Sequence, residues 1–280
     1  MNGGRKMKKG TIHVIENFYM PELNRYRTIR IYLPPDYNEA DRHYPVIYMH
    51  DAQNLFTVET SAFGSIWDIA ATLDSIYNEN PEKAYIVIGI DNGCNYRYSE
   101  YCPWYSEVGG EYLPHARTTG FLGGEGFKYI DFIVNTLKPF IDTTYKTLKD
   151  RENTAVCGSS MGGLISMCAG IKYQDVFSKI AAFSSAMYFA EEEVKSFIIS
   201  EGKREAMRIY MDVGTDETSN PDNPDFPQIY LSCNRNVYLA LKDAGFAFED
   251  VKYEIAEGGI HNEACWRKRF PGMMNWLFNL

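Results

Sequence analysis

Residues 153–164 read NTAVCGSSMGGL, a short apolar run that ends in two serines and three glycines. Apolar residues resume after the glycines, so the pattern predicts a buried strand followed at once by a helix. The pentapeptide Gly158 to Gly162 matches G-x-S-x-G, and its glycines leave room for a sharp strand-to-helix turn. A hydroxyl at the tip of such a turn is strained and accessible, which predicts Ser160 as a nucleophile and Ser159 as its neighbour. An ordinary glycine-rich turn is the alternative interpretation.

Similar apolar runs recur on both sides of this stretch, and each is too short and too uniformly apolar for an amphipathic helix. We expect buried parallel strands at residues 45–50, 84–90, 154–158, 179–185, 207–214 and 251–257. Helices are expected at 65–80, 125–145, 161–177, 190–200, 229–245 and 263–280. Two earlier segments, 11–18 and 26–34, alternate in a way typical of antiparallel strands. The sequence therefore predicts an α/β fold, with a mainly parallel sheet, an antiparallel N-terminal start and helices on both faces.

The 280 residues contain no repeat and no long linker, which predicts one domain over residues 1–280, with residues 1–10 as a flexible tail. The net charge of -9 argues against a nucleic-acid or anionic-membrane partner, because such partners are held mainly by clustered Lys and Arg. No apolar run is long enough to span a bilayer, and no secretory signal is visible.

Six cysteines are spread over the chain without any CxxC pair. Neither their spacing nor a neighbouring histidine favours a metal site, so they are predicted to be buried free thiols. No metal and no cofactor is expected.

A serine nucleophile needs a base, normally histidine, within hydrogen-bonding distance. His261 is the single histidine after Ser160, and it follows the last predicted strand in EGGIHNEACW. In enzymes with this turn the chain order is serine, acid, histidine, which predicts His261 as the base. A histidine that caps a helix or packs in the core is the alternative.

The acid that orients the histidine should follow a strand between these two positions. The segment MRIYMDVGTDE supplies Asp216 and Glu217 at the end of the penultimate strand, whereas Asp212 lies within the strand and is predicted to be structural. We favour Glu217, with Asp216 as the alternative acid. Either carboxylate could also be an ordinary turn residue.

An oxyanion in the reaction requires two backbone donors. One is predicted at Met161, directly after the nucleophile, and the other at Gln53 in the loop DAQNLF after the strand at 45–50. The polar side chains of Asp51, Gln53 and Asn54 could instead only stabilise that turn.

Aromatic residues crowd the segment CNYRYSEYCPWYSEVGGEY at 94–112. Its side chains could stack on an aromatic acyl group or on sugar faces, or could pack the loop onto the body of the protein. The predicted substrate-binding residues are Tyr98, Tyr101, Trp104 and Tyr105.

The blocks RIYLPPDYN, YPVIYMHDAQNLF, GIDNG, SEYCPW, GSSMGGL and EGGIHNEACWRKRFPGMMNWLF together resemble the putative-esterase family of α/β-hydrolases. That family includes feruloyl and acetyl-xylan esterases of carbohydrate esterase family 1 and enterochelin esterase-like enzymes. The resemblance extends from about residue 28 to the C-terminus. It implies the α/β-hydrolase fold, with Ser160 as nucleophile, His261 as base, Met161 and Gln53 in the oxyanion hole, and Glu217 in the acid turn.

The resemblance also implies a serine esterase that acts through an acyl-enzyme, on feruloyl or acetyl esters of plant polysaccharide. A siderophore trilactone esterase is the alternative substrate class, for which Arg97 and Arg117 are the candidate cations. An alternative of another kind is an inactive carbohydrate-binding protein that keeps the fold.

Overall fold

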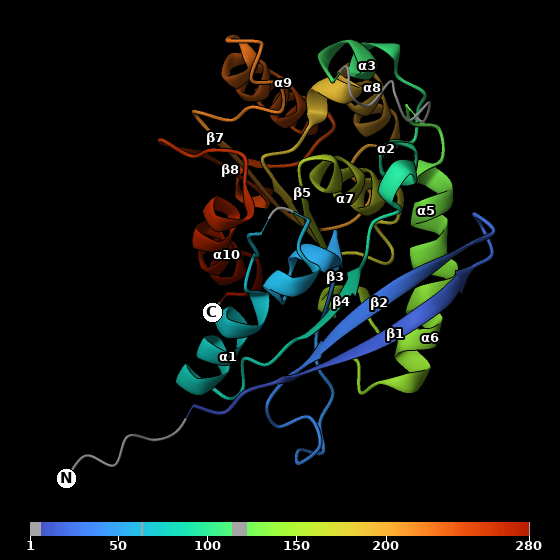
Figure 1. The fold of residues 1–280 in the computed structure, drawn as a ribbon, viewed down its shortest axis with the longest axis vertical. Helices are drawn as coiled ribbons and strands as arrows, with labels where there is room; N and C mark the ends of the chain where they lie inside the picture. Colours follow the sequence, from blue (N-terminus) through green and yellow to red (C-terminus); the bar gives the residue numbers. More distant parts are fainter. Residues whose placement is uncertain (1–6, 63, 114–121, 280) are drawn as a thin grey trace.

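A computed structural model describes residues 7–62, 64–113 and 122–279. Its centre is an eight-stranded sheet in the order β1-β2-β4-β3-β5-β6-β7-β8 (Figure 1). Strand β1 pairs antiparallel with β2, and β2 pairs antiparallel with β4; all later pairs are parallel. The predicted fold class, including its antiparallel start, is confirmed. The strands are β1 (Thr11–Met20), β2 (Arg25–Leu33), β3 (Val46–His50), β4 (Ile86–Ile90), β5 (Thr154–Ser159), β6 (Lys179–Phe183), β7 (Arg208–Gly214) and β8 (Val251–Ala256).

Strands β3, β4 and β5 are buried at every position because both faces of the sheet are covered. In β3, Tyr48 packs in one hydrophobic core and Met49 in the other. Strand β5 repeats this alternation with Val156 and Cys157. Strand β8 differs, since it lies at the edge and only Val251 is fully buried. The prediction of a buried strand is therefore wrong for β8.

Helices cover the two faces of the sheet unequally. Side chains of α1 and α10 pack in the smaller core, and those of α5 to α9 pack in the larger one, on opposite sides of the sheet (Figure 1). Helices α5 and α6 are joined through a π-helical turn at Ile133–Leu137. The helices are α1 (Ile69–Glu79), α2 (Arg97–Glu100), α3 (Glu107–Tyr112), α5 (Gly126–Phe132), α6 (Lys138–Thr144), α7 (Met161–Lys172), α8 (Glu191–Glu201), α9 (Phe226–Asp243) and α10 (Glu263–Phe278).

Helix α1 begins four residues later than its sequence pattern predicts. The N–H of Trp67 donates to the carbonyl of Asn54 at 3.0 Å, and the Trp67 side chain is buried between the loop after β3 and helix α10. Asp68 then turns the chain with a positive φ of 52°. Tertiary contacts thus replace the first predicted helical turn by a loop.

The described part of the N-terminal tail is bound to α1. The N–H of Lys8 donates to Asn78 Oδ1 at 3.0 Å, and the N–H of Gly10 donates to Asp74 Oδ1 at 2.8 Å. Residues 8–10 thus contact α1, whereas residues 1–6 lie outside the described part, and the flexible tail stays a prediction. The single-domain assignment stays a prediction.

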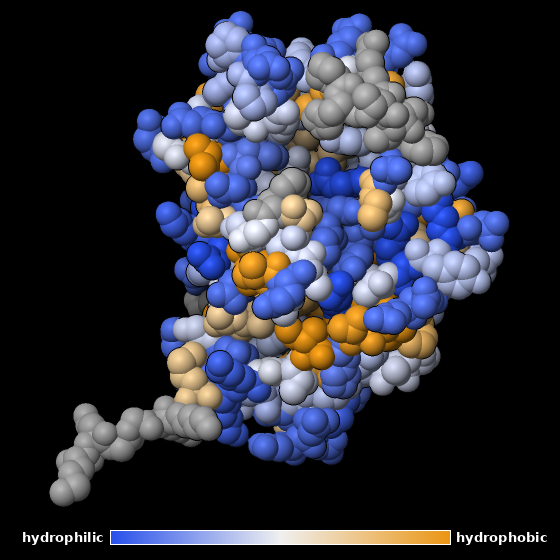
Figure 2. Space-filling model, viewed as in Figure 1, coloured by the Kyte–Doolittle hydropathy of each residue, from blue (hydrophilic) through white to orange (hydrophobic). Residues whose placement is uncertain are grey.

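Exposed apolar residues form patches on the surface. Figure 2 shows hydrophobic patches among hydrophilic residues on one face, one of them over β1 and β2, where Ile12 and Val14 are 37% and 48% exposed. Among the described residues, no helix is both long and apolar enough to cross a bilayer.

All six cysteines are free, but Cys94 is exposed and Cys265 half-buried, so the prediction of buried thiols is wrong for these two.

Candidate active site

Ser160 lies in a strained turn between β5 and α7. Its φ of 57° and ψ of -125° are unusual for a residue with a side chain. The N–H of Ser160 donates to the carbonyl of Phe183 on β6 at 3.0 Å, which fixes the turn to the neighbouring strand. A Cβ atom at Gly158 would lie only 2.5 Å from the carbonyl oxygen of Gly162, so this turn requires glycine there. The hydroxyl of Ser160 is thereby placed at the carboxyl edge of the sheet.

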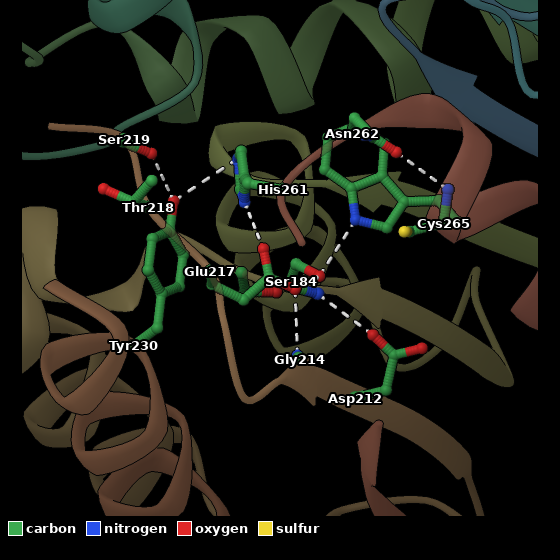
Figure 3. Close-up of polar contacts among 12 residues, drawn as sticks. Ser184, Asp212, Gly214, Glu217, Thr218, Ser219, Tyr230, His261, Asn262 and Cys265 are labelled. Atoms are coloured by element: carbon green, nitrogen blue, oxygen red, sulfur yellow. Dashed lines mark hydrogen bonds and ion pairs between the residues drawn. The ribbon is translucent and has the colours of Figure 1, made fainter. Parts of the chain in front are cut away.

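His261 lies in the loop between β8 and α10, and its ring is fixed by Glu217. The distance from His261 Nδ1 to Glu217 Oε2 is 2.6 Å (Figure 3). Glu217 is fully buried, and Gly214 donates a backbone N–H to its other oxygen, Oε1, at 2.9 Å. Burial alone would raise the pKa of Glu217, but the hydrogen bonds from His261, Ser184 and Gly214 lower it below its usual value. The carboxylate is therefore ionised when it holds His261.

The other two acidic residues of this segment have different surroundings. Asp216 is exposed. Asp212 is fully buried, pairs with Arg269 at 3.1 Å and accepts a hydrogen bond from Tyr210 at 3.0 Å. Burial raises the pKa of Asp212 to about 7, although Arg269 opposes that shift. Of the three carboxylates, Glu217 is the one bonded to His261.

The second ring nitrogen of His261 faces Tyr230 of α9. His261 Nε2 lies 3.3 Å from the Tyr230 hydroxyl, which is also 2.6 Å from Ser219 Oγ (Figure 3). Burial raises the pKa of Tyr230 well above its usual value, so the phenol stays protonated. No hydrogen bond joins His261 to Ser160 in the described part of the chain, although both residues line one cavity. Sequence reasoning missed Tyr230, because no local motif distinguishes it from other core tyrosines of α9.

The predicted oxyanion donors lie at two helix starts. Met161 is the first residue of α7, and Gln53 belongs to a 3-10 turn at Ala52–Asn54. Backbone N–H groups at the start of a helix have no acceptor within that helix, so they are available to an anion. The positions of both residues at the wall of the cavity are compatible with the predicted role.

The side chains of the turn after β3 are bound to the segment after β4 and to the start of α10. Asp51 forms a bidentate ion pair with Arg97, and both N–O distances are 2.8 Å. Gln53 Oε1 accepts the N–H of Asn92 at 3.1 Å, while Asn54 donates to Glu263 at 3.1 Å. These side-chain contacts stabilise the turn. The turn therefore holds the backbone of Gln53 in a defined position.

A cavity of about 800 Å³ opens over Ser160 and His261. Its charged lining residues are Asp51, Asp91, Arg97 and Glu263, and Arg97 is already paired with Asp51. The described part of the chain contains no cluster of three or more side chains suited to a metal ion. The larger apolar side chains of the described wall are Trp67, Tyr98, Leu113, Met161, Tyr188 and Trp266.

The predicted aromatic loop contributes less to this cavity than its composition indicates. Tyr98 lines the wall and stacks on Phe189 with ring centroids 5.7 Å apart. Tyr101 is fully buried, and its hydroxyl accepts the N–H of Asp51 at 3.1 Å. Trp104 packs on Phe127, and Tyr105 lies outside this cavity. The substrate-binding prediction is thus wrong for Tyr101, and the structure does not place Trp104 or Tyr105 at the site.

Comparisons with known proteins agree with this architecture. The family model described as "Putative esterase" matches residues 20–277. The chain is 27% identical over 252 residues to the uncharacterized protein YbbA of Bacillus subtilis (strain 168), covering 90% of this chain and 92% of that protein. Among solved structures, a ferulic acid esterase superposes with a TM-score of 0.67 at 17% identity, covering 96% of this chain and 99% of the other. The enterobactin esterase FES of Shigella flexneri superposes with a TM-score of 0.69 at 16% identity, covering 96% of this chain and 58% of the other. The chain therefore belongs to the putative esterase family and has the α/β-hydrolase fold.

Proposed function

We propose that this protein is a serine esterase that hydrolyses carboxylic esters through an acyl-enzyme. In this proposal Ser160 is the nucleophile, His261 the base and Glu217 the orienting acid. The observation that carries it is the 2.6 Å contact between Glu217 and His261 at a cavity that Ser160 also lines. A buried carboxylate on Nδ1 holds the imidazole in the tautomer whose Nε2 can accept a proton.

In the proposed first step, His261 Nε2 moves from the Tyr230 hydroxyl to the Ser160 hydroxyl. Such contacts commonly tighten only when substrate is bound. As the Ser160 oxygen attacks the ester carbonyl carbon, His261 takes the hydroxyl proton, and the carbonyl π electrons become an oxyanion. When the C–O bond breaks, His261 returns this proton to the departing alcohol.

The proposed oxyanion donors are the backbone N–H groups of Met161 and Gln53. Water then repeats the sequence in reverse: His261 takes its proton, the hydroxide oxygen bonds to the acyl carbon, and the Ser160 oxygen leaves and is reprotonated. The products are the free acid and a regenerated serine.

For the substrate, we propose an ester with an uncharged aromatic acyl group, such as a feruloyl ester of plant polysaccharide. Tyr98, Trp67 and Trp266 offer apolar faces that favour such a group. The structural similarity to a ferulic acid esterase supports the same class. An acetyl ester would occupy only a small part of a cavity of about 800 Å³.

The siderophore alternative is supported by the similarity to an enterobactin esterase but not by the charge of the cavity. An anionic catecholate calls for available cations near the site. Among the described lining residues, Arg97 is the single Lys or Arg, and its guanidinium is neutralised by Asp51. The other candidate, Arg117, lies outside the described residues.

A substrate panel tests this proposal. The kcat/KM for methyl ferulate should exceed the values for acetylated xylan and for a catecholate trilactone. Fastest turnover of the trilactone would favour the siderophore alternative. Binding of xylan oligosaccharides without turnover of any of these esters would instead favour the inactive carbohydrate-binding protein.

The assignment of the acid predicts unequal effects at two adjacent carboxylates. Glu217→Gln should lower kcat by about 10³- to 10⁴-fold, because the amide can no longer hold Nδ1–H in the productive tautomer. Asp216→Asn is the matched control: its side chain is exposed, and kcat should stay within about twofold of the wild type. Steady-state kinetics with p-nitrophenyl acetate measure both, and a larger loss in Asp216→Asn would move the acid to that position.

The aromatic wall predicts a substrate-dependent effect at Tyr98. Tyr98→Ala should raise KM for methyl ferulate by about 2- to 10-fold, the worth of one aromatic contact, with less change for p-nitrophenyl acetate. Tyr105→Ala removes an aromatic ring that is 62% exposed and lies outside this cavity, so it should change neither KM. Equal shifts for both esters in Tyr98→Ala would show that Tyr98 supports the fold of the loop and does not contact the acyl group.

A further inference from the structure

The hydroxyl of Ser184 is hydrogen-bonded to the Glu217 carboxylate (Figure 3), and Ser184 is not among the described residues that line the cavity. Ser184 follows β6 and has a positive φ of 42°, a strained conformation for a residue with a side chain. Its N–H donates to the carbonyl of Asp212 at 2.9 Å and faces Asp212 Oδ1 at 3.1 Å. Strain of this kind persists where surrounding contacts hold it, and it concentrates at functional sites.

The direction of the Ser184 hydroxyl follows from its neighbours. Trp266 Nε1 lies 2.9 Å from Ser184 Oγ, and a guanidinium nitrogen of Arg269 lies 2.8 Å from it. Indole and guanidinium groups can only donate, so these two contacts use both lone pairs of the hydroxyl oxygen. The Ser184 hydroxyl can then form one more hydrogen bond, as a donor through its own O–H, and the acceptor within reach is Glu217 Oε1. The hydroxyl must therefore point at Glu217.

Two donors thus meet one oxygen of this carboxylate, while the other oxygen accepts from His261. Oε1 receives the Ser184 O–H and the Gly214 N–H, and Oε2 receives His261 Nδ1–H. Arg269 adds a cation 3.6 Å from Oε1. With Oε1 held from two directions, rotation of the carboxylate away from His261 would break charge-assisted hydrogen bonds.

We propose that Ser184 is a positioning residue for ester hydrolysis, whose hydroxyl, oriented by Trp266 and Arg269, holds Glu217 against His261. This inference rests on the proposed triad. Helix α10 carries both orienting side chains, three residues apart and so on one face of the helix. The same helix begins two residues after His261, where Asn262 caps it by accepting the N–H of Cys265 at 2.9 Å. Helix α10 therefore helps to position both His261 and the Ser184 hydroxyl that holds Glu217.

Removing the hydroxyl tests the proposal. Ser184→Ala should lower kcat for p-nitrophenyl acetate by about 10- to 100-fold, the worth of a hydrogen bond to a charged group, with KM unchanged. Ser184→Gly removes the same hydroxyl and relieves the strain of a positive φ, so a similar loss of kcat with an unreduced Tm would separate catalysis from folding. Ser185→Ala is the matched control. The neighbouring Ser185 hydroxyl is buried without a hydrogen-bond partner among the described residues, and its removal should change kcat by less than about twofold.

A double-mutant cycle decides whether Ser184 acts through Glu217. If it does, the variant Ser184→Ala/Glu217→Gln should be no slower than Glu217→Gln alone. Losses that multiply, or a Ser184→Ala variant as active as Ser185→Ala, would overturn the inference while leaving the triad in place. A Glu217→Gln variant with wild-type kcat would instead remove the proposed acid itself, so the two failures are distinguishable.

Discussion

Replacing Ser160 with alanine should lower kcat for p-nitrophenyl acetate by on the order of 10⁶-fold, the loss expected when the nucleophile of a serine-histidine pair is removed. Ser160 stands at the tip of the strained turn between β5 and α7. The variant should fold normally, because serine and alanine are both non-glycine residues and face the same cost at a φ of 57°. The measurement is the initial rate together with Tm.

The control for this variant is Ser159→Ala, which removes the hydroxyl of the preceding residue. Ser159 ends β5 and is buried at 6% exposure, so its loss should cost far less activity than the loss of Ser160. Equal rates for Ser160→Ala and the wild type would exclude Ser160 as the nucleophile.

His261→Ala should have an effect of the same order, about 10⁵- to 10⁶-fold in kcat, because His261 takes the Ser160 proton in the proposed mechanism. Glu217 should keep its place in this variant, since Gly214, Ser184 and Arg269 still contact it. The fold should therefore persist, which circular dichroism and Tm can verify.

His43→Ala provides the histidine control for this experiment. His43 is exposed and does not line the cavity, so its removal should leave kcat within about twofold. Near-wild-type turnover in His261→Ala would assign the base to another residue.

The strand pattern could be predicted from the sequence because short, uniformly apolar runs are typical of strands covered on both faces. This rule holds for β3 and β5, where alternate residues enter the two cores. It fails for β8, whose position at the edge of the sheet depends on strand order and not on local composition. The predicted start of α1 is also wrong, because contacts with the loop after β3 and with α10 decide the structure there.

The sequence predicts only part of the candidate site. Ser160 and His261 carry local signals, namely a glycine-flanked turn and a single histidine in the right chain order. Asp216 and Glu217 are adjacent turn carboxylates, and only the folded chain shows which one enters the interior. Tyr230 belongs to α9 and Ser184 follows β6, so no local spacing in the sequence predicts that they contact the site.

The aromatic loop shows why composition alone misleads about binding. Tyr101 and Tyr98 are three residues apart, yet Tyr101 is fully buried and bonds the turn after β3, whereas Tyr98 reaches the cavity wall. Tyrosine serves both purposes equally well, since it has an apolar ring and a polar tip. The direction of each side chain, which depends on how the loop folds, separates the two roles.

Mass spectrometry tests most directly whether catalysis passes through an acyl group on Ser160. The protein is mixed with excess p-nitrophenyl acetate, quenched in acid within the first turnovers, digested and mapped. We expect an acetyl adduct on Ser160 in the peptide that contains residues 158–164, and a larger adduct population in Glu217→Gln if deacylation becomes slower than acylation. Turnover accompanied by an acyl adduct on another residue, and none on Ser160, would contradict the account.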